Sequence, residues 1–376
     1  MPIGLVPALQ LVRMTFLIID TYYPGFLRAC YAQHPEFQDR PYAEQWRVLM
    51  DQCFGTADFY SANLQKLGHD AHEVVANCEP LQRRWAREYA IHLWAAYPLY
   101  CRFGRVKAWQ MAVLKAQVEK FKPDVVYVQD LNWTDAAFLH AIKRTGRLVV
   151  GQTAYALRED MEWGPYDLIV SSLPHYVERF RRQGILCEYL RFAFEARVLK
   201  LLGSVKSRPA VVFVGGYTSN HTSGNRLFEH VAGQVPVDFW GYGGEALPVA
   251  SLIRRSFRGE AWGLQMYRIL AESQIGLNRH IDLSERFANN MRLFEATGVG
   301  TLLLTDWKDN LHELFEVGKE VVAYRTPQEC AELIRYYLEH DAERRAVARA
   351  GQERTLRDHT YQQRMKELAD IVRKYV

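Results

Sequence analysis

The chain has 376 residues, a length typical of two domains. Hydrophobic residues make up 49% and charged residues 24%, which excludes a largely disordered chain. The 47 Lys and Arg exceed the 43 Asp and Glu by only four, too few to indicate a nucleic-acid-binding protein. Aromatic residues are frequent at 13%, and such side chains suit either a large core or a surface that stacks on sugars or bases.

The N-terminus is apolar but has no basic residue before its apolar run, so we expect no signal peptide and treat the residues before Met14 as a poorly ordered leader. No run of 18 apolar residues predicts a transmembrane helix. The six cysteines form no CxxC pair and are expected to be reduced in a cytoplasmic protein. Neither a metal site nor a cofactor is predicted, because the chain contains no Asp-x-Asp pair and no clustered histidines.

The first half of the chain contains six short apolar runs that predict β-strands alternating with helices. Runs that are continuously apolar indicate strands buried on both faces, as in a parallel sheet covered by helices. The six runs are Thr15–Asp20, Glu73–Asn77, Asp124–Gln129, Leu148–Thr153, Asp167–Ser172 and Cys187–Arg191.

Two helical stretches rich in aromatic residues, Pro41–Leu67 and Leu81–Phe121, form an insertion between the first and third of these strands. Their aromatic side chains suit either core packing or an acceptor-binding surface. The four tryptophans of the insertion are Trp46, Trp85, Trp94 and Trp109.

The second half repeats the pattern of alternating strands and helices. Its expected strands are Ala210–Gly215, Val237–Gly241, Ile275–Asn278, Thr301–Asp306 and Glu320–Tyr324. Between the two series, Leu199–Pro209 contains Gly, Ser and Pro and is predicted to be a linker. These patterns predict two doubly wound α/β domains, 1–204 and 205–360, with residues 361–376 as a last helix that crosses back to the first domain. Within the helical tail, Gly351 is expected to break the helix.

Two glycine-containing loops follow strands of the second domain, and ligands of such sheets bind outside the carboxyl ends of the strands. Residues 215–226 include Gly215, Gly216 and Tyr217, and they precede an expected helix at 225–233 whose free N–H groups suit a diphosphate. In residues 241–245, Tyr242 stands between glycines and is a candidate to flank a base or sugar. Plain polar turns are the alternative interpretation of both loops.

A polar cluster in residues 275–307 is the most informative segment of the chain. Asn278, Arg279 and His280 end a strand, and a helix is expected from Ala288 to about Thr297. Its Arg292 and Glu295 share a face, where the carboxylate can accept hydrogen bonds from ribose hydroxyls. Arg279, His280 and Asn290 are candidate donors to phosphate oxygens. The alternative is that Arg292 and Glu295 form a surface ion pair.

In the first domain the polar groups at strand ends are 20–25, 129–133, 152–153 and 171–172. Among them Asp130 is the candidate catalytic residue, as a general base or as a ligand of acceptor hydroxyls. A structural role, as the cap of a helix starting near Thr134, is the alternative.

With these motifs in place, the chain resembles GT-B glycosyltransferases, and within the "glycosyl transferases group 1" superfamily it is most similar to the spore-maturation CgeB-like group. The matching pieces of the C-terminal half are Leu277–His280, Asn290–Gly300, Tyr324–Thr326 and Arg345–Gly351. Those of the N-terminal half are residues 54–77, 81–88 and 151–157.

The resemblance implies two Rossmann-like domains that face each other across a cleft, with the donor on the C-terminal domain and the acceptor on the N-terminal one. The family glutamate falls on Glu295 and would hold the donor ribose, and no metal is required. Many relatives carry another glutamate eight positions earlier, but here that position is Phe287, and Glu285 lies two residues before it. No role of that glutamate is transferred, and retention or inversion of the anomeric centre stays undecided.

The expected function is metal-independent transfer of a sugar from a nucleotide-diphosphate sugar to a hydroxyl of a glycan, lipid-linked or small-molecule acceptor. A nucleotide-sugar epimerase and a non-catalytic nucleotide-sugar-binding protein are the alternatives. No nucleic-acid partner is expected, and a peripheral membrane contact is left open because many glycosyl acceptors are lipid-linked. The base, the sugar and the oligomeric state are not predicted.

Overall fold

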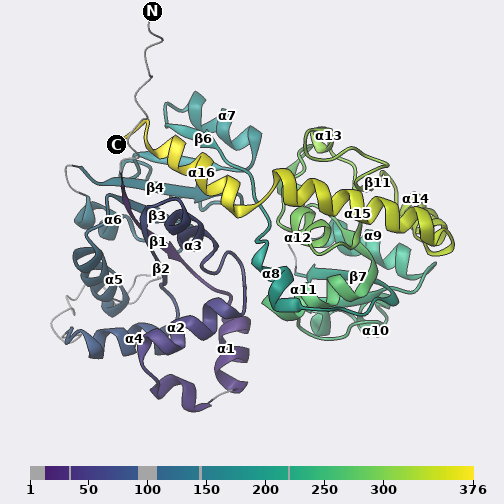
Figure 1. Cartoon of the computed structure of the whole chain (residues 1–376), viewed down its shortest axis with the longest axis horizontal. Helices are drawn as coiled ribbons and strands as arrows, with labels where there is room; N and C mark the ends of the chain where they lie inside the picture. Colours follow the sequence, from purple (N-terminus) through teal and green to yellow (C-terminus); the bar gives the residue numbers. More distant parts are fainter. Residues whose placement is uncertain (1–12, 34, 92–107, 144–145, 219–220) are drawn as a thin grey trace, which may run out of the picture.

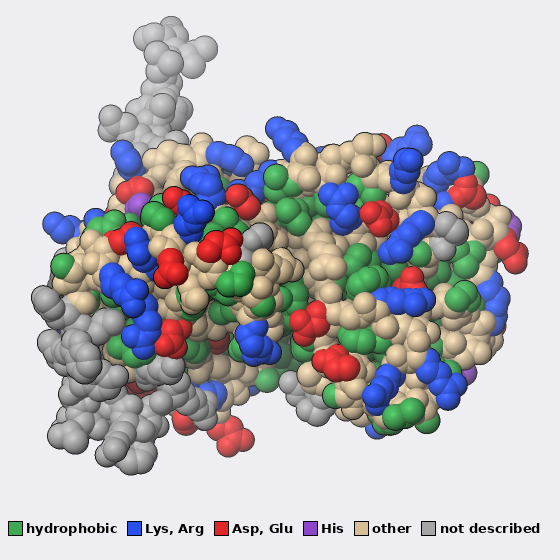
Figure 2. All heavy atoms as spheres, turned by 90° about the horizontal axis from the view of Figure 1, so that it is seen from below, with side chains coloured by type: hydrophobic (Ala, Val, Ile, Leu, Met, Phe, Trp, Pro, Cys, Tyr) green, Lys and Arg blue, Asp and Glu red, His purple; other side chains and the backbone are tan. Residues whose placement is uncertain are grey.

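The computed structural model describes residues 13–33, 35–91, 108–143, 146–218 and 221–376, which form two α/β lobes (Figure 1). Residues 1–12 of the expected leader lie outside the described residues, as does Trp94. Among the described residues, no helix is long and apolar enough to cross a membrane. On the face shown in Figure 2, basic and acidic side chains are interspersed over both lobes.

Each lobe contains one sheet of parallel strands, and the predicted fold class is confirmed. The first sheet has the order β2-β1-β3-β4-β5-β6, and the second has the order β11-β10-β9-β7-β8. The strands of the first sheet are β1 (Thr15–Asp20), β2 (Asp70–Val75), β3 (Val125–Val128), β4 (Leu148–Thr153), β5 (Leu168–Ser171) and β6 (Cys187–Tyr189). Those of the second sheet are β7 (Arg208–Gly216), β8 (Asp238–Tyr242), β9 (Ser273–Asn278), β10 (Leu302–Asp306) and β11 (Val322–Tyr324).

The two sheets share one topology, because the first strand of each lies between the second and the third. Strand order therefore reverses beside β1 in the first sheet and beside β7 in the second. Such switch points open a crevice at the carboxyl ends of the strands, where ligands of doubly wound sheets bind. The fold thus provides one crevice on each lobe.

Helices cover both sheets. The first lobe contains α1 (Pro24–Gln33), α2 (Tyr42–Asp51), α3 (Phe59–Lys66), α4 (Glu79–Glu88), α5 (Ala108–Phe121), α6 (Ala136–Ile142) and α7 (Pro174–Arg182). In the second lobe lie α9 (Thr222–Ala232), α10 (Leu252–Arg255), α11 (Gly263–Glu272), α12 (Arg292–Gly298), α13 (Leu311–Leu314), α14 (Pro327–Glu339) and α15 (Asp341–Asp358), and α16 (Tyr361–Val372) follows. The helix between α7 and α9 in the chain, α8 (Arg197–Leu202), packs against α11 of the second lobe (Figure 1).

The described tryptophans of the helical insertion have structural surroundings. Trp85 and Trp109 are buried in a small cluster with Val113, and the indole N–H of Trp46 donates to the Glu73 carbonyl at 3.0 Å. Their positions favour the core-packing interpretation over an acceptor-binding surface.

The prediction that Gly351 breaks the helical tail is wrong. Helix α15 runs through it from Asp341 to Asp358. A Cβ at this position would lie 2.3 Å from the Glu320 carbonyl oxygen, so the glycine lets α15 pack closely against its neighbours. The tail is interrupted at His340 and His359 instead, at the two ends of α15.

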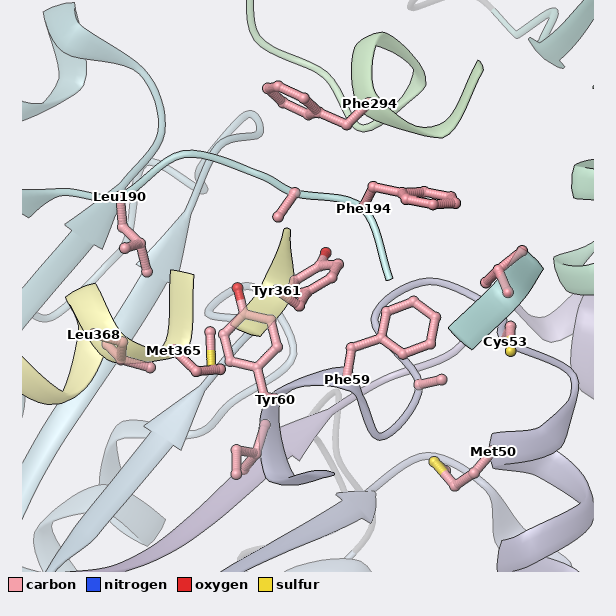
Figure 3. Close-up of a cluster of buried hydrophobic side chains, with 14 of the residues drawn as sticks. Met50, Cys53, Phe59, Tyr60, Leu190, Phe194, Phe294, Tyr361, Met365 and Leu368 are labelled. Atoms are coloured by element: carbon pink, nitrogen blue, oxygen red, sulfur yellow. The ribbon is translucent and has the colours of Figure 1, made fainter. Parts of the chain in front are cut away.

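The last helix, α16, lies on the first lobe (Figure 1). The Phe194 N–H donates to the His359 carbonyl at 2.8 Å, and the Tyr361 N–H donates to the Phe194 carbonyl at 3.0 Å. Figure 3 shows Tyr361 of α16 close to Tyr60 of α3, with Phe194 on the side facing Phe294 of the second lobe. One hydrophobic core therefore continues through both lobes.

Candidate functional site

A cavity of about 430 Å³ lies between the two domains, where the switch points of the two sheets face each other. The first domain contributes Asp20 and Thr21 from the end of β1, and the second contributes the ends of β7 and β9. Eight of the predicted donor-binding residues line this cavity: Gly215, Gly216, Tyr242, Asn278, Arg279, Asn290, Arg292 and Glu295. Residues from distant segments of the sequence thus form one site.

The glycines at the ends of β7 and β8 allow the two backbones to approach closely. Gly241 has a φ of +122°, and a Cβ there would lie 1.8 Å from the carbonyl oxygen of Gly215. A Cβ on Gly216 would lie 2.5 Å from the Tyr242 ring. Side chains larger than hydrogen would fill this wall, so the glycines keep the cavity open beside Tyr242.

Arg279 is fixed next to the first turn of α9. Its Nη2 donates to the Ser223 hydroxyl at 2.6 Å and lies 3.0 Å from a carboxylate oxygen of Asp282. Helix α9 begins at Thr222, three residues earlier than predicted. The guanidinium therefore adds a positive charge to the cavity close to the free N–H groups of a helix start, which suits phosphate oxygens.

The side-chain amides of Asn278 and Asn290 are joined at the cavity wall. Asn290 Nδ2 donates to Asn278 Oδ1 at 2.8 Å, and Asn278 Nδ2 donates to the Thr305 hydroxyl at 2.9 Å. Asn290 Oδ1 also accepts the Leu293 N–H at 3.2 Å. The predicted helix start at Ala288 is wrong: α12 begins at Arg292, and the Asn290 side chain just before it bonds both to Asn278 of β9 and to the first turn of the helix.

Arg292 and Glu295 form an ion pair of 2.8 Å, but both side chains are largely buried, so the surface-pair alternative is wrong. Burial raises the pKa of the Glu295 carboxyl, while the Arg292 guanidinium opposes this rise. Arg292 also donates to the Val214 carbonyl at 3.1 Å. The other oxygen of Glu295 has only a long 3.4 Å contact with the Tyr267 hydroxyl, which leaves acceptor capacity at the cavity.

Two predicted donor-binding residues, Tyr217 and His280, do not line the cavity. Tyr217 is buried and donates its hydroxyl to the Trp240 carbonyl at 3.0 Å. The His280 ring is buried with its Nδ1 2.7 Å from Asp306. Both follow strand ends, but their side chains point into the second domain, where the aromatic cluster and Asp306 hold them.

The first-domain wall carries Asp20, a carboxylate that sequence reasoning placed at a strand end but did not select. Its Oδ1 accepts the Thr21 N–H at 2.7 Å. Burial and, to a smaller extent, the charge of Asp130 raise the pKa of Asp20 to about 7, although the hydrogen bond from Thr21 opposes this rise. A carboxyl with this pKa at a cavity wall is suited to exchange protons near neutral pH.

Asp130, the predicted catalytic residue, is not among the side chains that line the cavity. Its carboxylate accepts the Thr21 hydroxyl at 2.6 Å and the Trp133 N–H at 3.1 Å. Asp130 does not cap the next helix, since α6 begins at Ala136 with Asp135 as its cap. Asp130 instead closes a local turn and holds Thr21 beside Asp20.

Aromatic side chains from both domains meet at one side of the cavity. The rings of Tyr242 and Trp262 are stacked with centroids 5.8 Å apart, and Tyr23 lies edge-on to both of them. Phe54 lies 5.5 Å from Trp262. This aromatic rim, Tyr23, Phe54, Tyr242 and Trp262, lets apolar contacts connect the two domains beside the polar wall.

His221 and Trp262 are further cavity residues that sequence reasoning did not select. His221 belongs to the glycine-containing loop after β7, and its position just before α9 is the signal that could have identified it. Burial and the nearby Arg279 charge lower the pKa of His221, so that it is neutral at pH 7. For Trp262 no comparable signal exists, because it precedes α11 far from any strand end.

Phe287, at the position of the additional glutamate of many glycosyltransferases, stacks on His175 with ring centroids 5.5 Å apart. Glu285 lies 4.0 Å from the His175 ring and does not line the cavity. Within the described part of the chain, no three His, Cys, Asp or Glu side chains are grouped to hold a metal ion.

The two facing α/β domains define the class of fold, and comparisons with known proteins agree with it. HepE from Anabaena, solved with UDP-glucose, has a TM-score of 0.58 at 14% identity, over 96% of this chain and all of that one. Sucrose-phosphate synthase from Thermosynechococcus elongatus has a TM-score of 0.56 at 10% identity, over 96% and 99%. AviGT4, a glycosyltransferase of avilamycin A biosynthesis, has a TM-score of 0.53 at 15% identity, over 95% and 98%. This chain has GT-B glycosyltransferases as structural neighbours.

The sequence itself matches a family model described as "Glycosyl transferase-like" over residues 214–370. The matched range begins at the end of β7 and includes every second-domain residue that lines the cavity except Phe213. No curated protein matches the sequence significantly. The finer resemblance to the CgeB-like group stays a prediction.

Proposed function

We propose that this protein is a glycosyltransferase that moves a sugar from a nucleotide-diphosphate sugar to an acceptor hydroxyl. The proposal depends mainly on one observation: a wall rich in polar side chains from the second domain faces a wall with a single carboxylate from the first domain across one cavity. The second-domain wall presents Arg279, Asn290 and Glu295, and the first-domain wall presents Asp20. The family match of the second domain and the UDP-glucose bound to HepE support a nucleotide-sugar donor.

On the second-domain wall, the Glu295 carboxylate accepts hydrogen bonds from the ribose hydroxyls of the donor. Arg279, together with the N–H groups of the glycine loop and the first turn of α9, binds the diphosphate. As the bond between the sugar and the diphosphate breaks, negative charge grows on the leaving phosphate, and these fixed donors stabilise it. Side chains and backbone of the protein provide this stabilisation, with no resident metal or cofactor.

On the first-domain wall, Asp20 accepts the proton of the acceptor hydroxyl as that oxygen attacks the anomeric carbon. The oxygen–hydrogen bond breaks, the new glycosidic bond forms, and the diphosphate leaves with the electron pair of the old bond. Because the pKa of Asp20 is about 7, the carboxylate is available at neutral pH and still basic enough to take a proton.

A thermal-shift panel of UDP, GDP, dTDP and their sugars tests donor binding directly. A stabilisation of about 2 kcal/mol requires ligand at roughly 30 times its dissociation constant, so millimolar nucleotide detects weak donors. We expect one base to stabilise the protein, and the matching nucleotide sugar to be consumed only slowly without acceptor. No stabilisation by any nucleotide would contradict the proposal, and conversion of the sugar nucleotide alone would favour the epimerase alternative.

A further inference from the structure

A second cavity of about 450 Å³ is lined by residues that follow β4, by residues of α7 and by Leu283 of the second domain. The first cavity is lined by Ala154 and Ile281, and the second by Ala156 and Leu283, each two residues further along the same loop. One loop follows β4 of the first domain, and the other follows β9 of the second. The linings of the two cavities therefore come within two residues of each other on both loops, one from each domain.

The loop that forms the second cavity is held in place by Asn132. The Asn132 side chain donates to the Ala156 carbonyl at 2.8 Å and accepts the Arg158 N–H at 3.0 Å. In return, Arg158 Nη1 donates to the Asn132 carbonyl at 2.9 Å. These three hydrogen bonds fix the loop without any ligand, so the cavity is formed in advance, as binding sites for small molecules usually are.

The lining of this cavity combines aromatic rings with planar polar groups. Trp163 supplies a half-buried ring that is anchored edge-on against Phe180 with centroids 4.9 Å apart, and the buried Tyr176 also lines the cavity. Arg179 is exposed on α7, where its guanidinium lies 5.9 Å from the Tyr176 ring and, among the described residues, has no ion-pair partner. The remaining polar lining groups are Arg158, Glu159 and Gln183.

This combination matches the chemistry of a sugar. A pyranose presents C–H groups on its faces, which pack on aromatic rings, and pairs of neighbouring hydroxyls at its edge, which suit guanidinium, carboxylate and amide groups. The charges disfavour a polyanion, because Glu159 lines the cavity and Asp160 lies 3.2 Å from Arg158 Nε. A neutral saccharide therefore fits better than a phosphate-rich ligand.

We infer that the second cavity binds the distal units of a saccharide acceptor whose terminal hydroxyl reaches the first cavity beside Asp20. This inference rests on the proposed glycosyl transfer and narrows its acceptor to a saccharide of two or more units. A single-sugar acceptor placed beside Asp20 would leave the groups around Trp163 without a ligand.

The test uses the full-length protein with saturating UDP on an array of di- to hexasaccharides. Three variants are compared with the wild type: Arg179→Ala, Trp163→Ala, and Arg182→Ala as a matched control. Arg182 lies on the same helix, is exposed and is not among the lining residues. We expect the wild type and Arg182→Ala to bind the same saccharides, and Arg179→Ala and Trp163→Ala to bind them at least tenfold more weakly.

Binding of UDP, measured by calorimetry, separates this inference from the proposed function. We expect the UDP affinity to be unchanged in all three variants. The inference is overturned if no saccharide of the array binds, if Arg179→Ala binds as the wild type does, or if Arg179→Ala loses UDP affinity, since the cavity would then hold the nucleotide. If Trp163→Ala does not fold, Arg179→Ala alone is used for the test. Absence of UDP binding in the wild type contradicts the proposed function instead.

Discussion

The two walls of the cavity are built in different ways. The second-domain wall is a network of polar side chains that bind one another before any ligand arrives, such as Asn278 with Asn290 and Arg292 with Glu295. The first-domain wall has one carboxylate, Asp20, among backbone and aromatic groups such as Tyr23 and Phe54. A charged donor needs many fixed contacts, whereas proton transfer needs one group of suitable pKa, and the two walls differ in this sense.

The largest expected effect of a substitution belongs to the first-domain wall. Asp20→Asn removes the proton acceptor, so we expect the turnover rate to fall by about 10²- to 10⁴-fold with unchanged UDP affinity. In the wild type the rate should rise with pH through about 7 as Asp20 ionises, and this rise should be absent in the variant. Steady-state kinetics and calorimetry measure both. In an Asp130→Asn variant the rise should move to lower pH without disappearing, because the charge that raises the pKa of Asp20 is removed, and an equal loss of turnover in both variants would contradict the assignment.

The next effect belongs to the second-domain wall. Glu295→Gln removes the charge from the hydrogen bonds to the ribose, and a loss of about 3 kcal/mol corresponds to roughly 100-fold weaker UDP binding. Calorimetry measures the affinity, and circular dichroism verifies the fold. Glu285→Gln is the matched control, because Glu285 is exposed and outside the cavity. Unchanged UDP affinity in Glu295→Gln would remove Glu295 from the site.

A smaller effect concerns the pH dependence of folding stability. It must be known before the pH dependence of the rate is assigned to Asp20. Burial lowers the pKa of His359 from 6.5 to about 4, so between these values the unfolded chain binds more protons than the folded one. The contribution of His359 to stability therefore falls as the pH falls, by roughly 2 kcal/mol from pH 7 to pH 5. Urea unfolding of the wild type and of His359→Gln at both pH values measures this contribution as the difference between the two proteins. The raised pKa of Asp20 acts with the opposite sign, favouring the folded state below pH 7.

The smallest expected effect tests whether Tyr217 belongs to the second-domain wall of the cavity. Tyr217→Phe removes a hydroxyl that bonds to the Trp240 carbonyl inside the domain, which costs about 1 kcal/mol of stability. UDP affinity should stay unchanged because Tyr217 does not line the cavity. Chemical denaturation and calorimetry provide the two measurements. Weakened UDP binding in this variant would return Tyr217 to the donor site.

The strands could be predicted because buried parallel strands are continuous apolar runs, and each expected strand overlaps an observed one. The direction in which a side chain points at a strand end could not be predicted from the sequence. Asn278 and Arg279 face the cavity while His280 faces Asp306, and nothing local distinguishes them. Likewise Asp20 ends β1 and Asp130 follows the neighbouring strand β3 at one sheet edge, so only the tertiary contact of Asp130 with Thr21 separates their roles.

The predicted ends of helices were wrong where contacts with other elements determine them. The start of α12 depends on the hydrogen bond of Asn290 with Asn278, which lies on a different element. The continuity of α15 through Gly351 depends on the approach of Glu320, more than thirty positions earlier. Local propensity contains neither contact, so the sequence pattern favoured a longer α12 and a broken α15.

The return of α16 to the first lobe affects the order in which the chain can fold. Synthesis proceeds from the N-terminus, but the helix that covers Phe59 and Tyr60 of α3 consists of residues 361–372. The first lobe therefore keeps an apolar face uncovered until residues 361–372 have been made. Exposed apolar surface of this kind favours aggregation during synthesis. A fragment that ends at the linker would retain this exposed face, so the two lobes are separate sheets but not separable folding units.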